Sequence, residues 1–243
     1  MLAWGLTDLG NVRKQNQDFY DIVRLDEACT LAVVCDGMGG AKSGNVASRL
    51  ATEVFVEEVK TSYRSEMDSS QIETMLRKAV EVANTTVYEQ SKVSADFEGM
   101  GTTLVAAVIQ PSGMIVVNVG DSRAYLFDKD GIRFMTVDHS LVELMVQRGE
   151  LTREQAKNHP GKNLITRAVG TEASVESDLY REDLKPGDAI LLCSDGLSNV
   201  LADQEILFEV VHGVQKDGCC QRLLEIAKGR GAPDNVTVVL VSL

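Results

Sequence analysis

Two short apolar runs in this chain each end in an aspartate–glycine step, and this repetition constrains the fold more than any other feature. The first is "LAVVCDGMGG" (residues 31–40) and the second is "AILLCSDGLSN" (residues 189–199). A run of five apolar residues is typical of a strand buried on both faces. Asp36 and Asp195 would then lie at the ends of core strands, where an unpaired carboxylate is costly. The fold must therefore compensate these charges.

The positions of the apolar runs predict strands paired in antiparallel order. Five runs have the length of buried strands, at residues 31–35, 104–109, 115–119, 189–193 and 236–241. The turn sequence "QPSG" (residues 110–113) separates two of these runs and predicts a hairpin. The two strands on either side of it are expected to be antiparallel neighbours.

Helical patterns lie between groups of strands rather than between single strands. Residues 46–59 and 72–87 each carry one apolar stripe at helical spacing, and Gly229 is expected to end a last helix. Three helix starts are predicted by capping sequences, at Ser70-x-x-Glu73, Ser140-x-x-Glu143 and Thr152-x-x-Gln155. This order differs from the regular alternation of a parallel sheet. It predicts one α+β domain over residues 1–243, with antiparallel sheets covered by helix pairs.

Composition excludes several classes of partner and chemistry. The 243 residues carry a formal net charge of −12, which disfavours binding to nucleic acid or anionic membranes. No apolar run has the length of a membrane span and the N-terminus lacks signal-peptide features, so a cytoplasmic location is expected. The number of cysteines, five, is odd, so no disulfide framework is predicted, and the lack of C-x-x-C spacing argues against a structural zinc site. None has an arginine six positions later, which excludes a cysteine-based phosphatase.

Two further aspartates lie next to predicted strands, since Asp121 follows one run and Asp234 precedes another. A single Asp-Gly step is most often a hairpin turn. Here, however, both Asp-Gly steps lead into helical sequence, and "GMGGAKS" lacks the glycine pattern of a phosphate-binding loop. Clustered aspartates with small neighbours suit Mg²⁺ or Mn²⁺, and Gly39 and Gly40 would leave room beside them.

A basic residue near these aspartates suggests what the cations would act on. Arg13 lies five residues before Asp18 in "GNVRKQNQDFY" (residues 10–20). Its guanidinium could make a two-pronged contact with a phosphate, while Asp18 joins the metal cluster. The alternative for an isolated arginine near an aspartate is a surface ion pair.

With these motifs, the sequence resembles the metal-dependent Ser/Thr protein phosphatases of type 2C, the PPM family, and most closely its compact bacterial branch. Eight stretches stand in the family's order and span nearly the whole chain: "TDLGNVRKQNQD" (7–18), "VVCDGMGGAKSGNVAS" (33–48), "GMGTTLVAAVI" (99–109), "VVNVGDSRAYLF" (116–127), "DHSLVELMVQRGELT" (138–152), "NHPGKNLITRAVG" (158–170), "GDAILLCSDGLSNVL" (187–201) and "GAPDNVTVVLV" (231–241).

The resemblance implies a four-layer αββα sandwich with a dinuclear Mn²⁺/Mg²⁺ site at one end. Asp36 would bridge the two ions and Gly37 would offer its carbonyl oxygen. The other implied positions are Asp195 and Asp234 as ligands, Asp18 directly or through water, Asp121 with Asp195 at a weaker third ion, and Arg13 at the substrate phosphate. Residues 139–163 would form a small helical flap beside the site.

The implied activity is hydrolysis of phosphoserine and phosphothreonine in proteins by in-line attack of a water or hydroxide shared by two metal ions. The family context adds a bacterial Ser/Thr kinase that the enzyme opposes, and the acidic surface suits a monomer. The alternative is a weak or inactive family member that acts as a metal-dependent binding or regulatory module.

Two positions depart from the family pattern. Gln17 replaces a glutamate that many relatives carry, and Met38 replaces the histidine that eukaryotic relatives place after the Asp-Gly step. A thioether cannot donate a proton, so water must protonate the leaving group.

His139 and His159 flank the expected flap, but an isolated histidine is more often structural than catalytic. His212 is expected at the end of a helix, where the dipole favours it.

Overall fold

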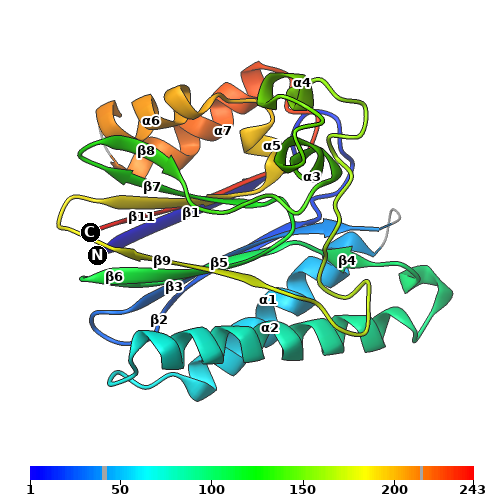
Figure 1. Cartoon of the computed structure of the whole chain (residues 1–243), viewed down its shortest axis with the longest axis horizontal. Coiled ribbons are helices and arrows are strands. Elements are labelled where there is room, and N and C mark those ends of the chain that lie inside the picture. Colours follow the sequence, from blue (N-terminus) through cyan, green and yellow to red (C-terminus); the bar gives the residue numbers. More distant parts are fainter. Residues whose placement is uncertain (40–42, 214–215) are drawn as a thin grey trace.

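The computed structural model describes residues 1–39, 43–213 and 216–243, so Gly40, expected beside the site, lies outside the described residues. Figure 1 shows two sheets stacked face to face, with helices covering both outer faces. One sheet has five strands in the order β1 (Leu2–Asp8), β11 (Val236–Ser242), β10 (Ala189–Cys193), β7 (Arg123–Asp128) and β8 (Gly131–Phe134). The six-stranded sheet has the order β2 (Asp18–Arg24), β3 (Thr30–Met38), β5 (Leu104–Gln110), β6 (Gly113–Val119) and β9 (Asp178–Asp183), with β4 (Gly101–Thr102) beside β3.

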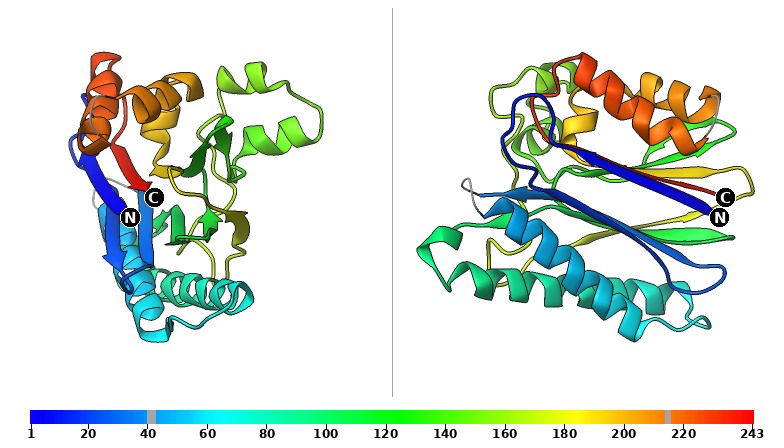
Figure 2. Two further views of the ribbon diagram at one scale, coloured as in Figure 1. Left: turned by 90° about the vertical axis from the view of Figure 1, so that its left-hand side faces the viewer. Right: turned by 180° about the vertical axis from the view of Figure 1, so that it is seen from behind.

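Helices cover each sheet on the side away from the other sheet. Helices α1 (Gly44–Ser62) and α2 (Ser69–Ser91) lie on the six-stranded sheet, and α6 (Asp203–His212) and α7 (Cys219–Gly229) lie on the five-stranded sheet (Figures 1 and 2). Shorter helices occur at α3 (Leu141–Gln147), α4 (Arg153–Lys157) and α5 (Asp195–Ser198), with 3-10 turns η1 (Ala95–Phe97) and η2 (Lys216–Gly218). All named strand pairs are antiparallel. The predicted α+β sandwich is confirmed.

Strand β3 shows why a continuous apolar run becomes a central strand. Its alternate side chains Leu31, Val33 and Cys35 pack in the apolar cluster beneath α1 and α2. The intervening Ala32 and Val34 pack in the cluster between the two sheets. Both faces are buried, so no position along 31–35 needs a polar side chain.

Three sequence-based predictions about element ends are resolved by the structure. The "QPSG" hairpin is confirmed, because Gln110 pairs with Gly113 at the turn between β5 and β6. The predicted helix start at Ser70 is wrong: α2 is capped by Asp68, whose side chain accepts from the Gln71 backbone N–H while Gln71 caps Asp68 in return. The predicted end of β3 before Asp36 is also wrong, since β4 pairs with Gly37 and Met38 and extends the strand to Met38.

No helix among the described residues combines the length and apolar character needed to cross a membrane. All five cysteines are buried and carry free thiols, as expected for a chain with no disulfide framework.

Candidate metal centre

Five aspartates from both sheets meet at one end of the sandwich. Asp18 and Asp36 face each other as register partners on β2 and β3. Asp195 starts α5 directly after β10, and Asp234 lies just before β11. Burial raises the pKa of Asp36 well above its usual range, and so do the charges of the aspartates around it, in decreasing order Asp18, Asp195, Asp121 and Asp234. The structure therefore brings together all five aspartates predicted from the sequence.

Asp18 is the most completely enclosed member of the cluster, at 6% exposure. Its Oδ2 atom accepts hydrogen bonds from the hydroxyls of Ser194 and Thr237, both at 2.7 Å. Its Oδ1 atom is buried and has no hydrogen-bond partner. Burial is the main cause that raises the pKa of Asp18 to about 7. Half of this carboxyl group is thus satisfied by the protein, and the other half is left without a donor.

Asp121, in the turn between β6 and β7, shows the same imbalance. It is 7% exposed, and its Oδ1 atom is buried without a hydrogen-bond partner. Burial raises the pKa of Asp121 to about 8, and the charges of Asp195 and Asp138 act in the same direction. The charge of Arg123 opposes this rise.

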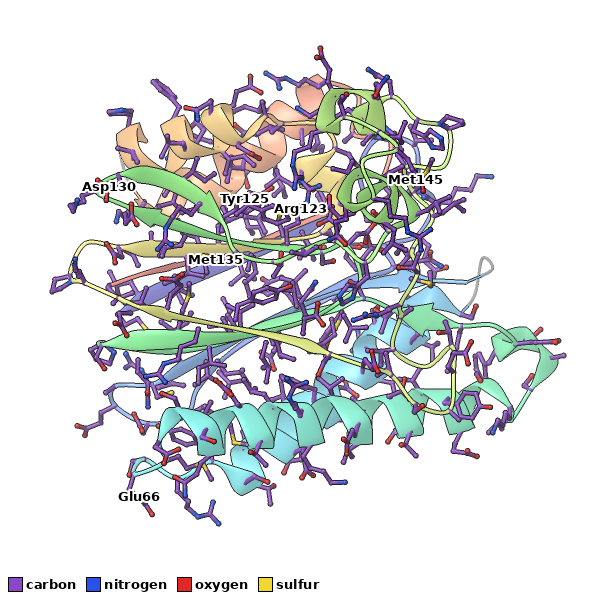
Figure 3. The ribbon with its side chains drawn as sticks, in the orientation of Figure 1. Glu66, Arg123, Tyr125, Asp130, Met135 and Met145 are labelled. Atoms are coloured by element: carbon purple, nitrogen blue, oxygen red, sulfur yellow. The ribbon has the colours of Figure 1, made fainter. Side chains whose placement is uncertain are left out.

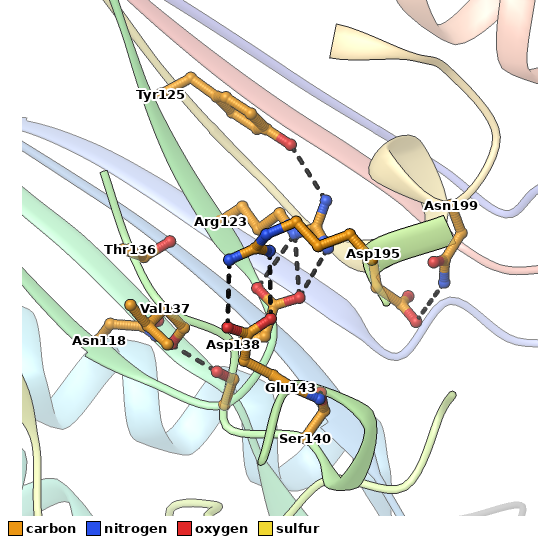
Figure 4. A network of polar contacts seen from close by, with 12 residues as sticks. Asn118, Arg123, Tyr125, Thr136, Val137, Asp138, Ser140, Glu143, Asp195 and Asn199 are labelled. Carbon is orange, nitrogen blue, oxygen red and sulfur yellow. Dashed lines mark hydrogen bonds and ion pairs between the residues drawn. The ribbon is translucent and has the colours of Figure 1, made fainter. Parts of the chain in front are cut away.

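The Asp195 carboxylate accepts a hydrogen bond from a residue of its own helix and interacts with Asp36 on the other sheet. The Asn199 side chain donates to Asp195 Oδ2 over 2.9 Å (Figure 4). The interaction with the Asp36 carboxyl lowers the pKa of both Asp195 and Asp18, against the larger effect of burial. Burial, followed by the charge of Asp234, raises the pKa of Asp195. Asp36 is therefore the central carboxyl group of the cluster.

The residues present fit divalent cations. Hard, oxygen-seeking ions such as Mg²⁺ and Mn²⁺ bind carboxylates that lack other donors, and Asp18 and Asp121 each have one buried oxygen of this kind. Among the described residues, no three histidine, cysteine, aspartate or glutamate side chains are already spaced as a complete ligand set. One of the five aspartates, Asp234, is ion-paired with Arg13. A bound cation would supply positive charge to offset these carboxylates.

Arg13 makes the ion pair that the sequence left as its alternative role. Its Nη2 atom donates to Asp234 Oδ2 over 2.6 Å, and the side chains are 51% and 31% exposed, respectively. The bond to Asp234 is the main cause that raises the pKa of Arg13, with contributions from Asp36 and Asp195. A pair this exposed contributes at most about 1 kcal/mol, so Arg13 can exchange Asp234 for another anion at little cost.

The glycines after Asp36 and Asp195 are required by close packing. A Cβ at Gly37 would clash with the backbone oxygens of Gly44 and Gln17, and a Cβ at Gly196 would clash with the Asn235 backbone oxygen. The Gly37 N–H also donates to the Gln17 carbonyl over 3.0 Å. These contacts explain the repeated Asp-Gly step without a hairpin turn.

Several residues that hold the site were missed from the sequence. Asn235 accepts from the Gln17 N–H at 2.8 Å and donates to the carbonyls of Leu9 and Gln15, so it anchors the loop that carries Arg13. Thr103 Oγ1 accepts from the Asp36 N–H at 2.9 Å and lies 2.7 Å from the Ser122 hydroxyl. Ser194 and Thr237 could have been found as polar residues next to or within apolar runs, but only the fold shows that both face Asp18.

The three histidines separate into different environments. His139 is buried and bonded to Gly120, next to Asp121, and to Asp178 on β9. His159 Nδ1 accepts from the Gly161 N–H at 3.0 Å, in the segment after α4. His212 is the last residue of α6, as predicted, and its ring lies 5.3 Å from that of Phe208.

Comparison with known proteins shows what the whole arrangement resembles. The family model for protein phosphatase 2C matches residues 11–224. The chain is 36% identical over 235 residues to the serine/threonine phosphatase stp of Listeria innocua, covering 97% of this chain and 93% of that protein. Its fold is similar to that of the S. agalactiae serine/threonine phosphatase, with a TM-score of 0.90, 36% identity, and coverage of 100% of this chain and 99% of that one. It is also similar to the catalytic domain of the phosphatase PstP in complex with two manganese ions, with a TM-score of 0.83, 32% identity, and coverage of 98% and 96%.

Proposed function

This chain belongs to the protein phosphatase 2C family and is a phosphoprotein phosphatase that acts on serine and threonine, and we propose that its five clustered aspartates hold the divalent ions of the reaction. The observation that carries this proposal is the pair of buried carboxylate oxygens, on Asp18 and Asp121, that have no protein donor. Buried polar atoms are almost always satisfied, so such orphans indicate a missing partner.

Each aspartate has a proposed place in the metal set. Asp36, the central carboxyl group, is proposed to lie between two ions, with the Gly37 carbonyl beside it. Asp195 and Asp234 complete the pair, and Asp18 contributes directly or through water. Asp121 and Asp195 are proposed to hold a third, weaker ion. When bound, the ions lower the pKa of coordinated water and offset negative charge on the phosphoryl group.

The protein's own groups bind and orient the substrate. Arg13 exchanges its ion pair with Asp234 for two phosphoryl oxygens, and its planar guanidinium fixes the phosphoryl group for in-line displacement of the serine or threonine oxygen. No side chain is needed as nucleophile: burial raises the pKa of Cys35 and of Cys193 to about 12, so neither thiol ionises near neutral pH. Because Met38 cannot donate a proton, the leaving oxygen takes its proton from water.

Further aspects of the proposal rest on the family and the sequence. The metal is Mn²⁺ or Mg²⁺, since PstP was solved with two manganese ions. The physiological substrates are proteins phosphorylated by an opposing Ser/Thr kinase, and the protein acts as a cytoplasmic monomer. Residues 139–163 form the flap, which contains α3 and α4.

Metal dependence tests the proposed function directly. We expect the purified protein to hydrolyse a phosphothreonine peptide and p-nitrophenyl phosphate only when Mn²⁺ or Mg²⁺ is present. Excess chelator should lower turnover to the uncatalysed rate, and added Mn²⁺ should restore it. Full activity in chelator would overturn the proposed metal site. Tight Mn²⁺ binding without hydrolysis would instead favour the binding-module alternative.

Replacing Arg13 separates phosphate binding from metal binding. The Arg13→Ala variant is expected to raise KM for p-nitrophenyl phosphate at least about 10-fold, because even one charge-assisted contact with a phosphate contributes about 1.5–3 kcal/mol. The Mn²⁺ affinity measured by calorimetry should stay the same or rise, since Asp234 loses its ion-pair partner. Arg133→Ala provides the matched control, since Arg133 also pairs with carboxylates, those of Asp128 and Glu182, but lies on β8. An unchanged KM in Arg13→Ala would contradict the proposed role.

A further inference from the structure

We propose that Asp138 and His139 are positioning residues that hold the chain on both sides of Asp121 and so aim its carboxylate; this inference rests on the proposed role of Asp121 as a metal ligand. The two residues are called here the 138–139 clamp. They lie just before Ser140, which caps helix α3. The sequence predicted no positioning role for either residue: Asp138 was only part of a motif, and His139 was an isolated histidine.

His139 holds the residue before Asp121 through two reciprocal bonds. The His139 backbone N–H donates to the Gly120 carbonyl over 2.9 Å. The Gly120 N–H in turn donates to His139 Nδ1 over 3.1 Å. Gly120 has a φ of +107°, and a Cβ there would clash with Thr103. Both backbone polar groups of this constrained glycine are therefore bound to His139, which fixes the peptide that leads into Asp121.

The far side of the His139 ring is fixed as well. Because Nδ1 accepts a hydrogen bond, the proton of the neutral ring lies on Nε2, which donates to Asp178 Oδ2 over 3.0 Å. Asp178 is also bonded through Oδ1 to Arg167, at 3.1 Å. His139 is only 6% exposed. The imidazole can neither rotate nor change tautomer without breaking one of these bonds.

Asp138 holds the residue two positions after Asp121. Its carboxylate accepts a two-pronged contact from Arg123, with Nε–Oδ1 at 3.0 Å and Nη2–Oδ2 at 2.6 Å (Figure 4). Arg123 also donates to the Tyr125 hydroxyl at 3.3 Å, and its guanidinium lies 4.9 Å from the centre of the Phe134 ring. A bidentate pair packed against an aromatic ring permits only one orientation of the guanidinium.

The carboxylate between these two anchors depends on them. Asp121 Oδ1 has no hydrogen-bond partner, so no protein donor orients that oxygen directly. Its direction follows from the backbone at 120–123, which the clamp fixes at Gly120 and Arg123. Residues that orient a ligand from behind typically change metal affinity by about 10–100-fold when replaced.

Two substitutions of His139 distinguish positioning from packing. In His139→Asn the side-chain oxygen can take the place of Nδ1 and accept from the Gly120 N–H. In His139→Gln the amide reaches toward Asp178 and leaves Gly120 N–H without its acceptor. We expect calorimetry with Mn²⁺ on the full chain to show the weakest binding step about 10-fold weaker in His139→Gln, with the tighter steps within about 2-fold. His139→Asn should remain within about 3-fold of wild type at every step.

A double substitution tests whether the effect passes through Asp121. In an Asp121→Asn background, adding His139→Gln should change Mn²⁺ binding by less than about 2-fold, because the carboxylate it aims is gone. His159→Gln is the matched control: it removes the same kind of ring acceptor, from Gly161, and should leave Mn²⁺ binding unchanged. Asp138→Asn removes the charge that pairs with Arg123 and should also weaken the weakest Mn²⁺ binding step. This variant replaces His139→Gln in the experiment if His139→Gln does not fold.

The proposal is overturned if His139→Gln binds Mn²⁺ like wild type, if His139→Asn is impaired equally, or if the loss persists in the Asp121→Asn background. These outcomes are distinct from failure of the proposed function, in which the wild-type protein itself would bind no Mn²⁺.

Discussion

The Asp36→Asn variant is expected to lose about 10³-fold or more of kcat/KM toward a phosphothreonine peptide. Asp36 is the central carboxyl group, on which the charges of the four other aspartates act, so its loss removes the charge proposed to lie between two ions. Metal ions contribute several kcal/mol to such reactions, and about 4 kcal/mol corresponds to 10³-fold in rate. Steady-state kinetics in saturating Mn²⁺ measures the loss, and calorimetry should show weaker Mn²⁺ binding.

Stability tells whether this loss comes from chemistry or from unfolding. Asparagine has nearly the size of aspartate but no charge, so the variant in chelator should be at least as stable as wild type, because four neighbouring aspartates no longer repel position 36. Asp130→Asn is the matched control, since Asp130 is 71% exposed and lies at the turn between β7 and β8, at the opposite end of the strand from Arg123 (Figure 3). Wild-type kinetics in Asp36→Asn, or loss of activity only through unfolding, would refute the central role of Asp36.

In chelator, the protein is expected to lose stability as pH rises from 5 to 8. Folding raises the pKa of Asp18 to about 7 and that of Asp121 to about 8, mainly through burial, from about 3.8. The folded state therefore binds more protons than the unfolded state within this window. Their contribution to stability is complete below pH 3.8 and is lost as pH rises through 7 and 8. The titrations of the two carboxyl groups are coupled, so their effects do not simply add. We expect the free energy of unfolding to fall by about 3 kcal/mol in total, which lowers Tm by roughly 10 °C.

Saturating Mn²⁺ should reverse this trend. Metal ions bind carboxylates in their deprotonated form, so the stabilisation by Mn²⁺ should grow as pH rises. Thermal unfolding at several pH values, in chelator and in saturating Mn²⁺, measures how Tm changes with pH in each condition. The Asp121→Asn variant should flatten the slope in chelator, since one of the two groups no longer titrates. A Tm in chelator that rises between pH 5 and 8 is incompatible with these buried carboxyls.

Most of the interior strands follow from the sequence, whereas the edge strands do not. All five apolar runs are strands, because a strand buried on both faces excludes polar side chains along its whole length. Six strands were missed. The edge strands β1, β2, β8 and β9 are largely half-exposed or exposed and tolerate mixed sequences. The two-residue β4 was missed too, and so was the interior strand β7, whose buried centre is flanked by Arg123 and Asp128. The cap of α2 was misplaced for a related reason: Ser70 and Asp68 offer equivalent local signals, and only one matches the start of the helix.

For the candidate site, sequence motifs identified the carboxylates but not the residues that hold them. Asp36 and Asp195 stand out because a charge at the end of an apolar run needs compensation. Ser194, Thr237 and Asn235 carry no such signal, since single hydroxyls and amides are common near strand ends. Their roles depend on contacts between residues up to 226 positions apart.

The sequence by itself determined five buried strands, the antiparallel order and the identity of the clustered aspartates, because hydrophobic periodicity and charge are local properties of a chain. Only the tertiary structure decided which groups compensate those charges. It paired Arg13 with Asp234, left one oxygen of Asp18 and of Asp121 without a donor, and set Asp138 and His139 on both sides of Asp121. Hydrogen bonds and ion pairs depend on distances within about 3 Å, and these arise only when both sheets and their connecting loops have packed.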